Sequence, residues 1–386
     1  MNPLPRRILF GGLLLLVGAG CRALPQSRPD ESLGEPAVML FRSALPSVSP
    51  SPSYFDLFNL DGMLLESKAI SGLVVPIQGQ VQAVGESIYV LRQDALKPNV
   101  VVRLGGAEDH VLGFMTADNR EPLAFIVSPD EETIAWVDAR TDDPKQVEIW
   151  VSDLDGGDRR LALEAGMYRG VPVLPMPIEW DPRGDLIFSR QIGELVYVPY
   201  FGFDSLYAYS WSDERVSPIV QLEACPPSVA EPRSAEEIAP GRWFAVSPDG
   251  TRAVGACSSS ESGLVDRLME RDVSTAAEVI LPARGQQDFV GGAAYSPSGE
   301  KLAFSACVQD ESFATSCQLA VLPRGQATAE WIAVHESWYI TKVVWIDEER
   351  LLVESLQEGR FQVEIVGVQG NTIPIGDGPL VGLTRR

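Results

Sequence analysis

A short phrase that recurs along the chain constrains the fold more than any other feature. Each copy has an apolar run, a turn rich in Pro, Asp and Gly, and a second apolar run. The four clearest copies occupy residues 125–138, 178–190, 244–257 and 294–307. A unit that returns every ~45–65 residues is typical of a repeat fold, in which each unit buries its apolar faces against its neighbours.

The residues of these turns predict that the two flanking runs are antiparallel neighbours. Proline fixes φ at the first turn position, Asp or Ser bonds to nearby backbone, and Gly accepts a positive φ. After the copy at 125–138, a third run at 147–152 leads through the turn at 153–157 into a fourth run at 159–163. Four antiparallel strands per repeat make one blade of a β-propeller. The best helical segment, 235–238, is only one turn long.

We therefore predict an all-β fold, a β-propeller of four-stranded antiparallel blades, with residues 37–386 as a single domain. Six repeats are complete, at about 79–105, 122–163, 176–222, 241–281, 290–333 and 341–376. A further blade would combine 37–42 and 55–66 with an inner strand at 378–383, from the far end of the chain. We favour seven blades closed in this way; six blades, with the N-terminal segment decorating the ring, is the alternative.

The repeats resemble TolB-type, WD-repeat-like propeller repeats. The resemblance rests on the Ser-Pro-Asp-Gly turn with its flanking runs and on the Leu-Asp-Gly-Gly turn at 154–157, and it covers roughly residues 120–335. It implies the propeller fold. It is hardly specific for activity, because relatives include periplasmic interaction proteins and the propeller domains of serine oligopeptidases.

Residues 1–20 have the features of a signal peptide. A basic pair, Arg6 and Arg7, precedes the apolar segment 8–17, and small residues follow. Small residues directly before Cys21 resemble a bacterial lipobox, in which the cysteine is acylated and becomes the mature N-terminus. This chain departs from the pattern at Gly18, where Leu is usual.

We favour acylation of Cys21 over an ordinary cleaved signal peptide, because the next cysteine is only at Cys225. Several acyl chains on one residue make membrane attachment firm. Residues 21–36 are polar and contain prolines, as expected of a flexible tether. The predicted location is extracytoplasmic, with a lipid anchor in the bacterial cell membrane or envelope.

The chain is strongly acidic, with 31 Lys and Arg against 53 Asp and Glu and a formal net charge of −22. Removal of the signal peptide takes away two of the basic residues. So acidic a surface repels phosphate backbones, so we expect no nucleic-acid partner. The simplest role of the charge is solubility.

Four further cysteines, Cys225, Cys257, Cys307 and Cys317, are an even number, which outside the cytoplasm suggests disulfides. Cys307 ends one predicted strand and Cys317 begins the next, a separation that fits a bridge across a hairpin. Cys225–Cys257 would then follow by default. The other two pairings remain open on the sequence alone.

The motifs of hydrolases and metalloenzymes are missing from this sequence. There is no Gly-x-Ser-x-Gly elbow, and the only histidines are His110 and His335, too few for a three-histidine zinc site. The acidic run at 153–158 lacks the spacing of an EF-hand and is explained as hairpin chemistry. We predict no catalytic residue, no metal and no cofactor. Paired carboxylates of the glycosidase kind meet only in three dimensions and stay an alternative.

Propeller topology predicts where a partner would bind. First-to-second and third-to-fourth turns share one rim, and they are short; second-to-third loops and blade-to-blade connections share the other, and they are long. We call these the short-turn rim and the long-loop rim. Binding residues usually lie on long loops carried by a rigid scaffold. The binding candidates at the long-loop rim are Tyr168, Arg169, Tyr200, Phe201, Phe203, His335, Trp338 and Tyr339.

Two functions follow from these features. The one that we favour is a membrane-tethered, non-catalytic binding or scaffold protein whose long-loop rim holds a protein or glycan ligand, its identity unknown. The alternative is an extracytoplasmic enzyme that acts on glycan or peptide substrates with carboxylates near the central channel.

Overall fold

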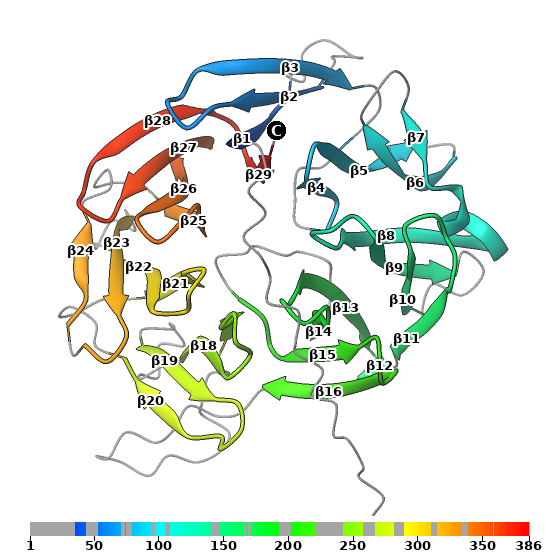
Figure 1. Ribbon diagram of the computed structural model, residues 1–386. Helices are drawn as coiled ribbons and strands as arrows, with labels where there is room; N and C mark the ends of the chain where they lie inside the picture. The colour runs from blue at the N-terminus through cyan, green and yellow to red at the C-terminus, as the bar shows by residue number, and fades with distance from the viewer. Residues whose placement is uncertain are drawn as a thin grey trace, which may run out of the picture. The chain divides into compact units, whose positions relative to one another are not determined.

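The computed structural model describes most of the repeat region. The described residues are 35–43, 53–70, 74, 79–94, 97–104, 109–140, 147–165, 167–168, 171–192, 202–220, 242–257, 267–281, 289–309, 315–326, 328–332, 339–357 and 359–385. They form seven antiparallel sheets arranged in a ring, which confirms the all-β propeller and the seven-blade count (Figure 1). The predicted signal peptide and Cys21 lie outside these residues.

Each blade contains four strands, which follow one another from the channel outward. Blade 1 is β4 (Val81–Val84), β5 (Ser87–Asp94), β6 (Lys97–Leu104) and β7 (His110–Val111). Blade 2 is β8 (Arg120–Val127), β9 (Thr133–Arg140), β10 (Val147–Asp153) and β11 (Arg160–Ala165). Blade 3 is β13 (Val171–Trp180), β14 (Leu186–Ile192), β15 (Leu206–Ser210) and β16 (Arg215–Val220), with the short β12 (Met167–Tyr168) paired to β13.

The remaining blades follow the same order. Blade 4 is β17 (Arg242–Val246), β18 (Arg252–Cys257), β19 (Arg267–Asp272) and β20 (Glu278–Ile280). Blade 5 is β21 (Phe289–Tyr295), β22 (Lys301–Gln309), β23 (Thr315–Pro323) and β24 (Glu330–Ile332). Blade 6 is β25 (Tyr339–Trp345), β26 (Arg350–Gln357), β27 (Arg360–Gly367) and β28 (Thr372–Asp377).

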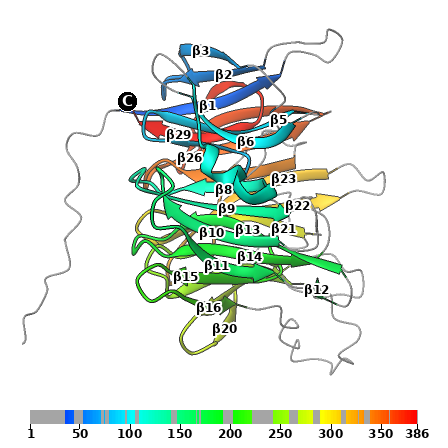
Figure 2. The same cartoon turned by 90° about the vertical axis from the view of Figure 1, so that its right-hand side faces the viewer.

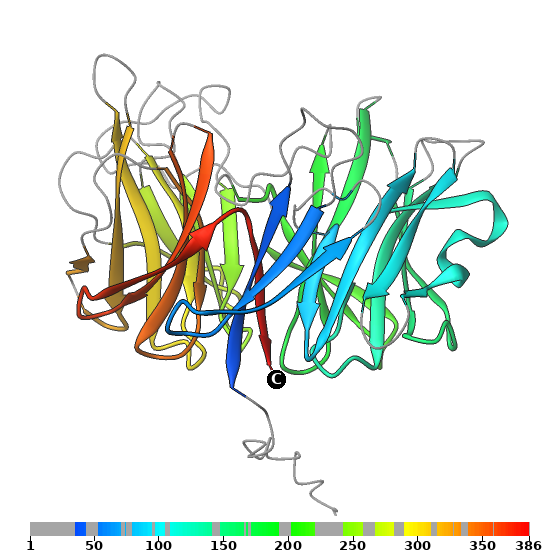
Figure 3. The ribbon, with the colours of Figure 1, turned by 90° about the horizontal axis from the view of Figure 1, so that it is seen from above.

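Blade 7 joins the two ends of the described chain. Its inner strand is β29 (Leu380–Arg385), which pairs with β1 (Pro36–Ser43), followed by β2 (Ser53–Phe58) and β3 (Leu64–Ile70). This is the closure predicted from the sequence. β1 begins and β29 ends at the same rim of the ring (Figure 3).

The hydrophobic core lies between neighbouring sheets rather than at the centre of the ring. Six clusters of buried side chains line successive blade interfaces, and they include the seams on both sides of blade 7. A blade in the ring is therefore covered on both faces. This explains the near-continuous apolar runs of middle strands such as β9, where five consecutive residues are buried, while the outer strand β3 is mostly exposed.

Among the described residues, one short helical element breaks the β pattern. The 3-10 helix η1 (Gly113–Asn119) packs against β6 and β8, between blades 1 and 2 (Figure 2). Met115 on η1 is fully buried there. Within the described ranges, no helix is long or apolar enough to cross a membrane.

The Ser-Pro-Asp-Gly turn forms a small hydrogen-bonded unit. The Ser247 hydroxyl donates to Asp249 (2.6 Å) and accepts the N–H of Arg252 (2.9 Å), while Gly250 takes a φ of 71°. The Ser247 hydrogen bond lowers the pKa of Asp249 to about 2. Ser128 binds Asp130 and the N–H of Thr133 in the same way.

Residues just after these turns connect neighbouring blades. Arg252 donates to the carbonyl of Gly299 in the next turn (2.7 Å), and Lys301 donates to the carbonyl of Glu348 in the turn after that (2.7 Å). The short-turn rim is thus held together by a series of cation–carbonyl contacts. The contacts at this rim therefore stabilise the ring.

We predict that Ser247→Ala lowers the free energy of unfolding by about 1–2 kcal/mol, because the N–H of Arg252 and the Asp249 carboxylate both lose a partner. The measurement is a chemical denaturation curve at pH 7. The matched control is Ser217→Ala on the exposed part of β16, which should stay within about 0.5 kcal/mol of the parent. Equal curves for Ser247→Ala and Ser217→Ala would contradict this role of the turn.

Candidate functional site

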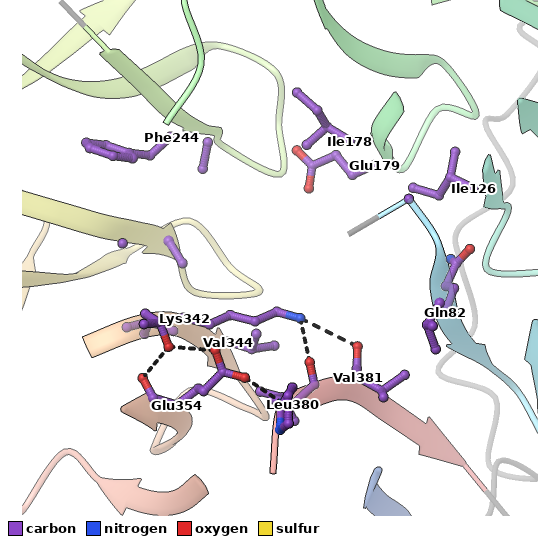
Figure 4. A pocket seen from close by; sticks show the side chains of 18 of the residues that line it. Gln82, Ile126, Ile178, Glu179, Phe244, Lys342, Val344, Glu354, Leu380 and Val381 are labelled. Atoms are coloured by element: carbon purple, nitrogen blue, oxygen red, sulfur yellow. Dashed lines mark hydrogen bonds between the residues drawn. The ribbon is translucent and has the colours of Figure 1, made fainter. Parts of the chain in front are cut away.

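The axial channel contains a cavity of about 780 Å³ (Figure 4). All seven inner strands contribute to its wall, a volume and setting typical of small-molecule sites. The apolar side chains of the wall include Val81, Ile126, Ile178, Phe244, Val344 and Val381. This cavity was not predicted from the sequence, because its wall is assembled from strands that lie far apart in the chain.

β-Bulges shape the wall of this cavity. In most inner strands the register against the second strand shifts by one or two residues. An extra residue lies in the wall at Ile178, Phe244, Thr341 and Val381. A bulge re-aims side chains and interrupts regular pairing, so these strands present more side chains to the channel than a regular strand would.

In the described part of the chain, the channel-side edge of β13 is paired only at its start, where β12 meets Val171 and Pro172, and this explains an unusual sequence. β13 contains Pro172, Pro175 and Pro177, and proline lacks the N–H that a central strand needs. Edge strands tolerate proline because one side of the backbone makes no ladder bonds. The predicted repeat began at 176, whereas the strand begins at Val171; the boundary was misjudged because prolines usually end a strand.

Lys342 and Glu354 fasten β29 to blade 6. The Lys342 ammonium donates to the carbonyls of Leu380 (3.1 Å) and Val381 (3.5 Å). Glu354 accepts the N–H of Leu380 (2.5 Å) and the hydroxyl of Thr341 (2.6 Å). Desolvation lowers the pKa of Lys342, and the charge of Glu354 opposes that shift. Both charged groups in this part of the wall therefore hold structure together.

Gln82 is engaged in a similar way on the other side of the channel. Its amide donates to the carbonyl of Val127 (2.9 Å) and accepts the N–H of the same residue (2.7 Å). The side chain thus bridges β4 and β8 like a short piece of strand. Neither end of the amide depends on a ligand.

Glu179 is different from the other polar groups of the wall. It lies one residue before the end of β13 and points into the cavity, facing the side from which Lys342 projects (Figure 4). In the described part of the chain no hydrogen-bond donor contacts its carboxylate. The side chain is exposed to the open space of the channel, and protein surrounds that space. Desolvation, with a further contribution from the negative charge of Asp181, raises the pKa of Glu179 to about 7.

The structure separates the candidates predicted for the long-loop rim. Tyr339 is the first residue of β25 and is 39% exposed. Tyr168 lies in β12, next to the start of β13. Phe203 is only 1% exposed and packs in the core between blades 2, 3 and 4, where it pairs with Trp243, so it belongs to the core and the cavity wall rather than to an exposed binding surface. The remaining candidates, Arg169, Tyr200, Phe201, His335 and Trp338, lie outside the described residues.

The predicted hairpin disulfide is present. Cys307 on β22 and Cys317 on β23 are directly opposite each other, with an S–S distance of 2.04 Å and a Cα–Cα distance of 4.0 Å. Cys257, at the end of β18, is buried and also disulfide-bonded. Cys225, its predicted partner, lies outside the described residues. Among the residues that the structure describes, no three His, Cys, Asp or Glu side chains gather to form a metal site.

Comparison with solved structures agrees with this architecture. The chain is similar to a puromycin-hydrolyzing peptidase of Mycobacterium tuberculosis, with a TM-score of 0.56, 15% identity, and coverage of 89% of this chain and 53% of the peptidase. It is also similar to a putative 6-phosphogluconolactonase of Bacteroides uniformis, with a TM-score of 0.53, 12% identity, and coverage of 92% and 100%.

TolB from Acinetobacter baumannii matches with a TM-score of 0.42 and 12% identity, over 90% of this chain and 82% of TolB. No protein-family model and no curated protein sequence matches the chain. The structural neighbours have different activities and low identities, so they support the propeller fold and no particular function.

We predict that Glu179→Gln raises the melting temperature at pH 8, by on the order of 1–2 °C. In the folded protein the pKa of Glu179 is about 7, above its ordinary value of 4.5, so the folded state binds this proton more tightly than the unfolded state does. The parent therefore loses stability as the pH rises from 4.5 to 7. The glutamine variant has no proton to lose at this position, so it keeps that stability at pH 8. The effect is small because water in the channel screens the charge.

The measurement is thermal unfolding of both proteins at pH 8 and pH 4, with Glu330→Gln on the exposed outer strand β24 as the control. The gain from Glu179→Gln should disappear at pH 4, where the carboxyl group is protonated in both states. A gain that is the same at the two pH values would contradict the raised pKa.

Proposed function

We propose that this protein is an extracytoplasmic β-propeller, anchored to the bacterial membrane through acylated Cys21, that binds a protein or glycan at its long-loop rim without catalysis. The disulfide between Cys307 and Cys317 supports a location outside the reducing cytoplasm. The lipobox-like sequence before Cys21 supports the anchor. The observation that carries the proposal is the point at which the chain enters the ring.

The described chain enters the ring at Pro36, the start of β1, and β1 begins at the short-turn rim (Figure 3). The fifteen residues from Cys21 to Glu35 can span at most about 50 Å. A tether of this length would keep the short-turn rim toward the membrane and leave the long-loop rim available to partners. Tyr339, half-exposed at the start of β25, lies at the end of its strand that belongs to the long-loop rim.

The state of the polar groups in the channel favours binding over catalysis. Acid–base chemistry on a glycan or peptide needs a pair of groups that can exchange protons with the substrate. Of the charged groups in the cavity wall, Lys342 and Glu354 are committed to fastening β29. Glu179 is then left without a catalytic partner among the described wall residues.

The test is crosslinking in native membranes followed by capture of the tagged full-length protein. Tyr339→Ala should remove the crosslinked partner and leave the melting temperature within about 1 °C, because the side chain is 39% exposed and exposed residues contribute little to stability. The matched control is Arg324→Ala in the turn between β23 and β24, whose half-exposed side chain pairs with Glu300 at the short-turn rim. Capture that Arg324→Ala loses and the aromatic variant keeps would refute the assignment of the rim.

Cys21→Ser in the same experiment tests the anchor separately. This variant should lose metabolic labelling by fatty acid and leave the membrane fraction. Retention of the label would show that acylation does not occur at Cys21.

A further inference from the structure

The axial cavity carries an inference beyond the proposed function, because its ligand would be a small molecule held inside the channel rather than the protein or glycan proposed for the long-loop rim. We propose that the cavity is a binding site for a small organic monocation, an ammonium group on an aromatic or aliphatic body, with Glu179 as its counter-ion. Three features of the site support this class of ligand: the wall, the free carboxylate and the way in which the other charges are used.

The wall of the cavity suits an apolar body. Ile126, Ile178, Phe244, Val344 and Val381 surround the space, and a volume of about 780 Å³ accommodates a small organic molecule with some water. Few polar groups of the wall are free to bind the hydroxyl groups of a ligand. Both ends of the Gln82 amide, for example, are hydrogen-bonded to the backbone of Val127. A sugar would leave most of its hydroxyl groups unpaired here, at a cost for each.

The free carboxylate selects the sign of the charge. Glu179 projects into this apolar space with no described donor bound to it (Figure 4). An ammonium group supplies both the charge and the N–H donors that the carboxylate lacks, and charge-assisted hydrogen bonds of this kind are the stronger ones. A divalent metal ion is less suited, because Ca²⁺ takes six to eight oxygen ligands and one carboxylate offers two.

The remaining charges limit the ligand to a single positive charge. Lys342 projects from the facing wall, and its ammonium repels a second cationic group at the far end of a ligand. Glu354 is not available to pair with a second cationic group, because its carboxylate already accepts hydrogen bonds from the N–H of Leu380 and the hydroxyl of Thr341. The acidic molecule as a whole attracts cations to the channel.

The experiment is isothermal titration of the full-length protein at pH 8 with phenethylamine, 2-phenylethanol and phenylacetate, which have the same ring and differ in charge. Phenethylamine should bind to the parent and to Glu330→Gln, and at least about 10-fold more weakly to Glu179→Gln. The alcohol and the acid should bind at least about 10-fold more weakly than the amine to the parent.

Several results would overturn the proposal. These are undiminished amine binding in Glu179→Gln, equal binding of the alcohol, preferential binding of phenylacetate, or no binding of the amine by the parent. Thermal unfolding of each variant verifies that it is folded, and Glu179→Gln is isosteric with the native side chain. Loss of partner capture at the long-loop rim has no bearing on this outcome, so the two proposals fail separately.

Discussion

The pairing of β1 with β29 is the constraint on which the rest of this structure depends. Every blade buries both of its faces against neighbouring blades, so no blade can form an exposed end of the ring. An open ring would expose the apolar faces of the first and last blades to water. Blade 7 removes both exposed faces at once, because it takes its inner strand from one end of the chain and its other three strands from the opposite end.

The closing strand is held by more than its ladder with β1. Lys342 and Glu354 of blade 6 form hydrogen bonds with the backbone of β29. The hydroxyl of Thr384, on β29 itself, donates to the carbonyl of Gly85 in blade 1. β29 is short, so its ladder alone gives limited stability. Buried polar contacts are costly when one partner is lost, and these contacts therefore specify a single position for the strand. The channel depends on the same strand, since Leu380 and Val381 form part of its wall.

Local chemistry made the blades predictable from the sequence. The Ser-Pro-Asp-Gly turns have strong backbone preferences, and strands buried on both faces leave long apolar runs, so the blades, the hairpin disulfide and even the closing strand were found. The start of β13 was missed because prolines are tolerated only on an edge strand, and the edge is a property of the closed ring.

The candidate site was far less predictable. Glu179 follows Pro177 and Ile178 in a sequence that has no motif, and its surroundings come from six other blades. The bulges that re-aim wall residues leave no clear mark in the sequence either. Phe203 was assigned to an exposed loop by its aromatic neighbours, although tertiary packing buries it. Sites built from one residue per repeat escape local patterns, because their geometry exists only after the ring has closed.

A designed disulfide tests the closure most directly. Leu40 and Leu380 are opposite each other, and the N–H of Phe41 donates to the carbonyl of Pro379 beside them, as in a non-hydrogen-bonded pair, where the Cα atoms lie close together. The double variant Leu40→Cys/Leu380→Cys should form the Cys–Cys disulfide on mild oxidation, which peptide mapping detects. The oxidised form should unfold at a higher temperature than the reduced form. Two thiols that stay free and titratable in the folded, oxidised protein would contradict the closed seven-bladed ring.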